Sequence, residues 1–173
     1  MKIELWTDGS CTQGNAPKKS KKKYLKGSGG YGGIIRIIGD NKEIRFYGGK
    51  LRTTNNEMEL VSIEKGLQII SVEFSTSVSL LIYTDSTWVY KCLTGIWNCT
   101  EREEIRTKIN NEMNKFKKWD GRDSIFGLFE GKTVKSHSKV HYNDMADRLS
   151  NKGRLMVTES ESDVQLSYEY FQV

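Results

Sequence analysis

Hydrophobic and polar residues alternate in three segments near the start of the chain, and each segment predicts a strand. Lys2–Trp6 alternates and then meets a Thr-Asp-Gly sequence that is typical of a turn. Tyr31–Ile38 and Glu43–Tyr47 repeat the strand pattern on either side of a turn at residues 39–41. We expect the three strands to form an antiparallel meander.

A helical period replaces this alternation after residue 54. Thr54 supplies the side-chain oxygen that caps a helix, and apolar residues then recur at i, i+3, i+7 and i+10 from Leu60 to Ile70. Val78–Tyr83 is a continuous apolar run, which is typical of a buried central strand. These patterns predict an amphipathic helix followed by an interior strand.

The next segments continue the alternation of helices and strands. Thr87–Leu93 predicts a short helix, and apolar residues on one face predict a second helix from Ile105 to Phe116. Residues 124–134 have a last strand pattern. The sequence therefore predicts an α/β fold in which a mixed five-stranded sheet is flanked by helices, with its first three strands antiparallel.

The end of the chain is less regular. We expect a loop at residues 137–141 and a helix over Asn143–Leu149 that stops at Gly153, since glycine favours helix ends. The tail, residues 156–173, is acidic and mixed in composition, and we assign no structure to it from the sequence. No internal repeat or linker divides the chain, so residues 1–173 are expected to form one domain.

Composition narrows the class of protein. With 173 residues, 36% hydrophobic and 28% charged, the chain can bury a core and is expected to be a soluble monomer without membrane contact. A strand pattern begins directly after Met1, where a signal peptide would need an apolar run. Three cysteines without CxxC spacing, Cys11, Cys92 and Cys99, predict reduced thiols and a cytoplasmic location. The net charge of +5 favours a polyanionic partner.

The most basic segment is a loop inserted between the first two strands, at about residues 16–28. Such a stretch cannot bury a core. It could be a solvated loop, a clamp for nucleic-acid phosphates or a nuclear-localisation signal. The residues that would contact phosphate are Lys18, Lys19, Lys21, Lys22 and Lys23.

Four acidic residues stand at the ends of predicted strands or on predicted helices: Asp8, Glu59, Asp85 and Asp147. Taken singly, each has an ordinary structural interpretation as a turn former, a helix cap or a solvated charge. Taken together in a basic chain, they indicate a divalent-metal site acting on phosphate, because hard cations take oxygen ligands.

The sequence blocks around these acids resemble the type 1 ribonuclease H family. TDGSCTQGN, GGYGGIIR and RTTNNEMEL resemble its first strand, its second strand and the entry to its first helix. YTDSTWV and VKSHSKVHYNDMADRLS resemble its fourth strand and its histidine loop with the last catalytic helix. The blocks follow the family order over roughly residues 3–153, and the resemblance implies a ribonuclease H-like fold.

The resemblance also implies an activity, the endonucleolytic hydrolysis of the RNA strand of RNA–DNA hybrids by two-metal-ion catalysis, giving 5′-phosphate and 3′-hydroxyl ends. Asp8 would bridge two Mg²⁺ ions, Glu59 and Asp85 would complete one site and Asp147 the other, and Mn²⁺ could substitute. His137 would assist proton transfer or product release.

The resemblance further implies contacts with the hybrid, whose RNA strand is distinguished by its 2′-hydroxyls. Backbone groups near Gly9–Cys11 and nearby asparagines would straddle the two strands, while Arg52 and Thr54 would hold a DNA phosphate. The full set of expected substrate contacts is Gly9, Ser10, Cys11, Asn15, Arg52, Thr54, Asn55, Asn56 and Asn143.

The chain departs from the family pattern in three places besides the lysine-rich loop. Residues 93–101 pass almost directly to the next helix, where many bacterial relatives carry a basic helical protrusion. Glu57 stands at a position that is often basic, which is expected to weaken contact with the DNA backbone. Ser136 and Ser138 flank His137 where glycine is common.

Two alternatives stay open from the sequence. The wider superfamily includes DNA-directed nucleases, resolvases and integrases, which share the same fold. A catalytically inactive hybrid-binding module is a second alternative, although it would have little reason to keep all four carboxylates.

Overall fold

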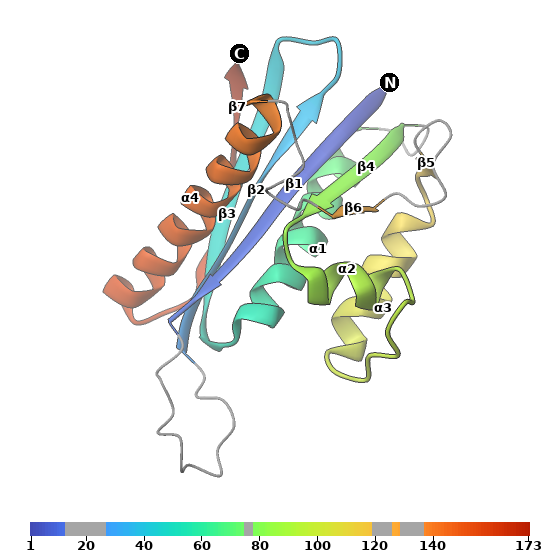
Figure 1. The fold of residues 1–173 in the computed structure, drawn as a ribbon. Coiled ribbons are helices and arrows are strands. Elements are labelled where there is room, and N and C mark those ends of the chain that lie inside the picture. Colours follow the sequence, from blue (N-terminus) through green and yellow to red (C-terminus); the bar gives the residue numbers. More distant parts are fainter. Residues whose placement is uncertain (13–26, 75–77, 119–125, 129–136) are drawn as a thin grey trace.

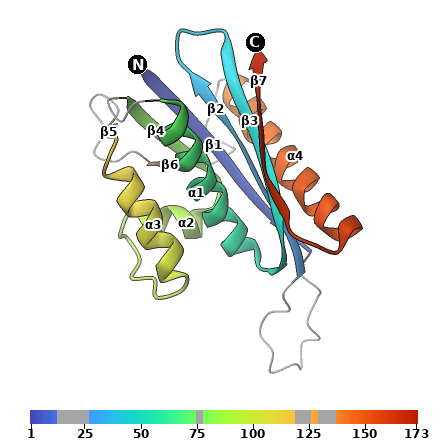
Figure 2. The ribbon, with the colours of Figure 1, turned by 180° about the vertical axis from the view of Figure 1, so that it is seen from behind.

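A mixed β-sheet separates two helical layers in the computed structural model (Figure 1). Among the described residues, helices from the middle of the chain lie on one face of the sheet and the long helix near the C-terminus lies on the other, as the view from behind in Figure 2 also shows. The structure describes residues 1–12, 27–74, 78–118, 126–128 and 137–173.

The first three strands form the predicted antiparallel meander. They are β1 (Lys2–Cys11), β2 (Gly27–Ile37) and β3 (Lys42–Thr53). The turn expected after Trp6 is wrong, because β1 stays paired with β2 as far as Cys11. Asp8 therefore lies inside a strand, opposite Gly32.

The fourth strand joins this meander in parallel, which makes the sheet mixed as predicted. β4 (Ser79–Thr84) pairs with β1, and its other edge carries two short parallel strands, β5 (Lys117–Lys118) and β6 (Phe126–Leu128). The strand predicted over residues 124–134 is confirmed at β6, and its other residues lie outside the described part of the chain.

On one face of the sheet lie α1 (Asn55–Glu73) and α2 (Thr87–Leu93), and α3 (Glu103–Met113) packs against α1 on the same side. Thr54 caps α1 as predicted, since its hydroxyl accepts a hydrogen bond from the Glu57 amide at 3.3 Å. The apolar face of α1 is fully buried against β1, β2 and β3. Each such aliphatic side chain stabilises the fold by roughly 1.5–3 kcal/mol.

The opposite face is covered by α4 (His137–Ser160). Two expectations about this segment are wrong: residues 137–141 are helical, and the helix does not stop at Gly153. No glycine or proline precedes Gly153 in the helix, so nothing in the sequence breaks it earlier. Gly153 instead permits close packing on β3, because a Cβ there would lie 2.0 Å from the Gly48 carbonyl oxygen.

A second small core lies under α4. Trp6 stacks on Tyr83 with ring centroids 4.0 Å apart, and Tyr142 and Ala146 of α4 pack against this pair. These contacts fix the helix against β1 and β4, so that side chains from α4 can reach the carboxyl ends of both strands.

The tail forms a strand that the sequence patterns did not assign. β7 (Val164–Gln172) pairs antiparallel with β3 and extends the sheet beyond the predicted strands. Tyr168 and Tyr170 project from it and donate hydrogen bonds to the Glu73 carboxylate at the end of α1. β7 thereby joins the edge of the sheet to the helical layer.

The cysteines do not all follow the prediction. Cys92 and Cys99 form a disulfide with their Cα atoms 5.5 Å apart, whereas Cys11 keeps a free thiol. The expectation of three reduced thiols is therefore wrong for two of them. The reason is local, because the chain turns back after α2 and returns Cys99 to the end of that helix.

No helix within the described residues is both long enough and apolar enough to cross a membrane.

Candidate active site

Four elements bring the predicted carboxylates to one surface cleft. Asp8 comes from β1, Glu59 from α1, Asp85 from the residue after β4 and Asp147 from α4, and all four line the same cleft. Carboxylate oxygens of the first three lie within 4.8 Å of one another. The acids that no short motif connects in the sequence therefore meet in the fold.

Close packing of α1 on β1 creates this arrangement. A Cβ on Gly9 would lie 2.2 Å from the Glu59 amide nitrogen, so only glycine allows the helix to approach the strand at this point. The neighbouring Asp8 is 7% exposed and Glu59 is 5% exposed. α1 thus places the almost fully buried carboxylate of Glu59 next to that of Asp8.

Burial and mutual repulsion dominate the electrostatics of these acids. Burial raises the pKa of Asp8 from 3.8 to about 7, the charges of Asp85 and Asp147 act in the same direction, and a hydrogen bond from Ser150 opposes them. Burial also raises the pKa of Glu59 well above its ordinary value, with the charges of Asp8 and Asp85 adding to it. A cation would relieve both effects.

The donor atoms fit a divalent metal ion. Glu59 Oε2 is buried and has no hydrogen-bond partner among the described residues, which is costly for a carboxylate oxygen unless a ligand takes it. The cluster offers only oxygen donors, the type that hard divalent cations prefer. Asp147 stands outside the tight group of three but faces the same cleft.

Sequence comparison identifies the family. The RNase H family model matches residues 1–154. "Ribonuclease H" of Rhodospirillum rubrum is 29% identical over 169 residues, covering 96% of this chain and 92% of the relative. "Ribonuclease H" of Wolbachia sp. subsp. Drosophila simulans is 32% identical over 152 residues, covering 87% and 93%. The chain belongs to the RNase H family.

A solved structure supports the fold of this RNase H chain. The structure described as LC11-RNase H1 in complex with RNA/DNA hybrid superposes with a TM-score of 0.62 at 18% identity, covering 90% of this chain and 99% of that one. The predicted ribonuclease H-like fold is therefore confirmed.

Neighbouring polar residues orient the carboxylates of this RNase H site. Two of these neighbours, Asn55 and Asn143, were predicted as substrate contacts. Asn55 Nδ2 donates to Glu59 Oε1 at 3.4 Å, and Asn143 Nδ2 donates to Asp85 Oδ2 at 3.3 Å. Asn55 lines the cleft together with Gly9, Ser10 and Cys11. Their roles toward substrate stay predictions.

The other predicted substrate residues lie beside the cleft or outside the described chain. Arg52 is exposed with a left-handed φ of 57°, Thr54 caps α1 and Asn56 lies in its first turn. Asn15 and the five lysines of the inserted loop fall outside the described residues. His137 is the first residue of α4, and the role expected for its side chain stays a prediction.

Sequence reasoning missed three residues on α4 that surround the acids: Ser150, Asn151 and Arg154. Ser150 Oγ lies 2.6 Å from Asp8 Oδ2, and Asn151 Nδ2 lies 2.9 Å from Asp147 Oδ1. Their spacing of three, four and seven residues after Asp147 is the signal that could have found them, since such positions share a helix face. The helix was predicted only over Asn143–Leu149, so these three residues were not placed on that face, whereas α4 extends to Ser160.

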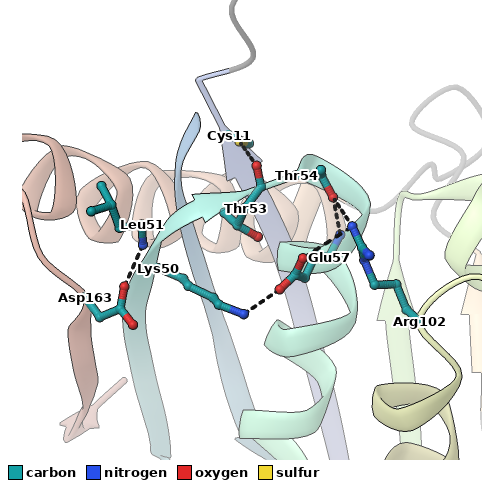
Figure 3. A network of polar contacts seen from close by, with 8 residues as sticks. All are labelled: Cys11, Lys50, Leu51, Thr53, Thr54, Glu57, Arg102 and Asp163. Carbon is teal, nitrogen blue, oxygen red and sulfur yellow. Dashed lines mark hydrogen bonds and ion pairs between the residues drawn. The ribbon is translucent and has the colours of Figure 1, made fainter. Parts of the chain in front are cut away.

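A polar network lies beside the cap of α1 (Figure 3). Glu57 is buried and forms ion pairs with Lys50 at 2.6 Å and with Arg102 at 3.4 Å. Arg102 also donates to the Thr54 hydroxyl at 3.3 Å. The negative charge of Glu57, which was expected to weaken contact with DNA, thus faces two cations of the chain itself.

Proposed function

We propose that this chain is an endonuclease that hydrolyses the RNA strand of RNA–DNA hybrids with the help of divalent cations. The observation that carries the proposal is the meeting of Asp8, Glu59 and Asp85 oxygens within 4.8 Å, in a chain of the RNase H family. Asp147 faces the same cleft and completes the set of four acids.

Asp8, Glu59, Asp85 and Asp147 would hold the metal ions, which we propose to be two Mg²⁺, with Mn²⁺ as a substitute. When bound, such ions activate water for attack on phosphorus and stabilise the leaving oxygen. The products would carry 5′-phosphate and 3′-hydroxyl ends.

Hydrogen bonds from neighbouring residues orient the acids for metal binding. Asn55, Asn143 and Ser150 donate hydrogen bonds to Glu59, Asp85 and Asp8 in turn, so one oxygen of each carboxylate is fixed. Because α1 buries Glu59 beside Asp8, both acids keep a proton more readily than exposed acids do. Cation binding would therefore release protons from the cleft.

Recognition of the hybrid is proposed for the rim of the cleft. Gly9, Ser10 and Cys11 line it from β1 and Asn55 from α1, and uncharged polar groups of this kind can bond sugar hydroxyls in a wide minor groove. Thr54 and Arg52 follow at the entry to α1, where a DNA phosphate could approach the helix N-terminus.

One experiment separates this function from its alternatives. Cleavage of matched RNA–DNA hybrid, duplex DNA and duplex RNA is measured during a Mg²⁺ titration, with Asp85→Asn beside the parent. We expect metal-dependent cleavage of the hybrid alone and a loss of at least about 100-fold in Asp85→Asn. Asp144→Asn is the matched control, because this exposed acid of α4 lies outside the cleft and its loss should leave the rate unchanged.

Cleavage of duplex DNA in preference to hybrid would replace the proposal with a DNA-directed nuclease. Tight hybrid binding without cleavage at any Mg²⁺ concentration would instead indicate an inactive binding module. Equal losses in Asp85→Asn and Asp144→Asn would contradict the assignment of the metal site.

A further inference from the structure

Arg154 brings a positive charge into a cleft that is otherwise built from acids. Among the described residues that line the active-site cleft, it is the only cation. It projects from α4 and lies close enough to β1 for its charge to act on the Cys11 thiol across the cleft. The guanidinium thus stands beside the strand whose backbone is expected to contact the hybrid.

The guanidinium is held in place without being neutralised. Arg154 Nη2 and Nε donate to Asn151 Oδ1 at 2.9 and 3.3 Å. These bonds go to a neutral amide, and no carboxylate in the part of the chain that the structure describes forms an ion pair with Arg154. A cation oriented by an amide keeps its full charge for a ligand.

Asn151 connects this cation to the metal-site acid Asp147. Its Nδ2 donates to Asp147 Oδ1 at 2.9 Å while its Oδ1 accepts from Arg154. The orientation of the amide is fixed chemically, since a guanidinium only donates and a carboxylate only accepts. One amide group therefore separates Arg154 from Asp147 and prevents their direct pairing.

The chemistry of this arrangement fits a phosphate. A guanidinium presents several N–H donors in a plane and binds phosphate oxygens in pairs, and the donors of Arg154 that Asn151 does not use stay available. Under the proposed function, the phosphate that is cut would lie at the carboxylates that would hold the metal ions. A cation displaced from them by one amide group is placed for a neighbouring phosphate of the same strand.

We propose that Arg154 binds a phosphate of the cleaved strand next to the scissile one, and that Asn151 is a positioning residue that orients both Arg154 and Asp147. The proposal rests on the proposed function, because it assumes that a nucleic-acid strand crosses the cleft. It assigns recognition to the second half of α4, beyond the residues that hold metal.

The test compares Arg154→Ala and Arg154→Lys with Arg148→Ala. Arg148 is an exposed residue of the same helix outside the cleft, so its variant removes an equal charge from the same element. Hybrid affinity is measured by fluorescence anisotropy over a range of salt concentrations, in an Asp85→Asn background that prevents cleavage. Steady-state kinetics are measured in the active background, and thermal melting shows whether each variant is folded.

Arg154→Ala should weaken hybrid binding about tenfold or more, and should reduce the slope of log affinity against log salt by about 0.9. It should raise KM by a similar factor with kcat changed less than about twofold, because the contact is made before and during the reaction alike. Arg154→Lys should restore the slope but only part of the affinity, since lysine lacks the paired donors. Arg148→Ala should change affinity less than about twofold.

Asn151→Ala tests the positioning role. If Asn151 acts through Arg154, the variant should raise KM in the parent but have little further effect on KM in Arg154→Ala. A merely structural contribution would add equally in both backgrounds and would overturn this part of the proposal.

Failure of this inference is distinguishable from failure of the proposed function. If the parent cleaves hybrid while Arg154→Ala and Arg148→Ala behave alike in KM and salt slope, Arg154 is an ordinary surface charge. If the parent does not cleave hybrid, the anisotropy series still decides whether Arg154 binds the strand.

Discussion

The Ser150 hydroxyl lies 2.6 Å from Asp8 Oδ2 and joins residues that are 142 positions apart in the sequence. It connects α4 to β1 at the centre of the acid cluster, and it is fully buried. The hydroxyl also lies 2.9 Å from the Asp147 carbonyl oxygen, one turn earlier in its own helix. The Ser150 hydroxyl can therefore donate its hydrogen bond either to Asp8 on β1 or to the Asp147 carbonyl oxygen within α4.

Ser150→Ala should impair metal binding more than folding. The hydrogen bond from Ser150 lowers the pKa of Asp8, so its removal should raise that pKa and let protons compete better with the metal. We expect the Mg²⁺ concentration for half-maximal cleavage to rise several-fold and the acidic limb of the pH–rate profile to move upward. Ser150→Thr keeps the hydroxyl and should retain most of the parent behaviour. An unchanged Mg²⁺ dependence in Ser150→Ala would contradict this role.

Asp8 should make the metal-free protein less stable as pH rises. Its pKa is raised from 3.8 to about 7 by folding, so the folded state binds the proton more tightly than the unfolded chain does. Stability from this group is complete below about pH 4 and is lost as pH rises towards 7. Asp8→Asn should therefore increase the free energy of unfolding at pH 8 by on the order of 2–4 kcal/mol, and much less at pH 4.

Urea unfolding in the presence of a chelator measures this difference at the two pH values. Saturating Mg²⁺ should remove or reverse the advantage of Asp8→Asn, because the parent then gains binding energy that the variant lacks. Equal stability of the parent and the variant at both pH values without metal would contradict the assigned origin of the pKa shift.

Much of this fold could be predicted because its local patterns agree with its tertiary contacts. The alternation in the first strands, the cap at Thr54 and the apolar run of β4 each matched the structure, since these residues pack where their own periodicity directs them. All four acids could be linked by family resemblance, and the fold then placed the oxygens of Asp8, Glu59 and Asp85 within 4.8 Å of one another.

The misses arose where packing overrides local preference. Gly153 looks like a helix end, but its missing side chain is needed where α4 crosses β3. β7 pairs with β3, and the alternation of Val164, Leu166 and Tyr168 with polar residues is the signal in the tail that could have predicted it. Arg154 lies beyond the predicted end of this helix, and only the longer α4 brings it to the site. The disulfide was missed since Cys92 and Cys99 meet only through the turn after α2.

Gly9→Ala should disturb both the fold and the site. The added Cβ would lie 2.2 Å from the Glu59 amide nitrogen, so α1 must move away from β1. We expect a loss of about 1–3 kcal/mol in the free energy of unfolding, together with a large loss of cleavage because Glu59 no longer meets Asp8. Ser10→Ala, one residue further along β1, is the control for stability and should cost far less. Similar stability in both variants would contradict the close-packing argument.

Reduction of the Cys92–Cys99 disulfide should destabilise the protein moderately. The bond closes a loop with a sequence separation of 7, and loop-closure entropy for that size predicts about 2.5 kcal/mol. Dithiothreitol should lower the free energy of unfolding by that order in the parent. The double variant Cys92→Ala/Cys99→Ala should not respond to the reductant. An equal response of both proteins would mean that the effect comes from another group.

The lysine-rich insert is predicted to strengthen the grip on the hybrid. The chain lacks a basic protrusion between α2 and α3, where residues 94–102 form a short connection instead. Replacing Lys18, Lys19, Lys21, Lys22 and Lys23 by Ala should raise KM at moderate salt with little change in kcat, because each lysine that neutralises a phosphate contributes to binding before the chemical step. The effect should shrink at low salt, where binding is already strong. A KM that does not change at any salt concentration would mean that the insert is a solvated loop without a role in binding.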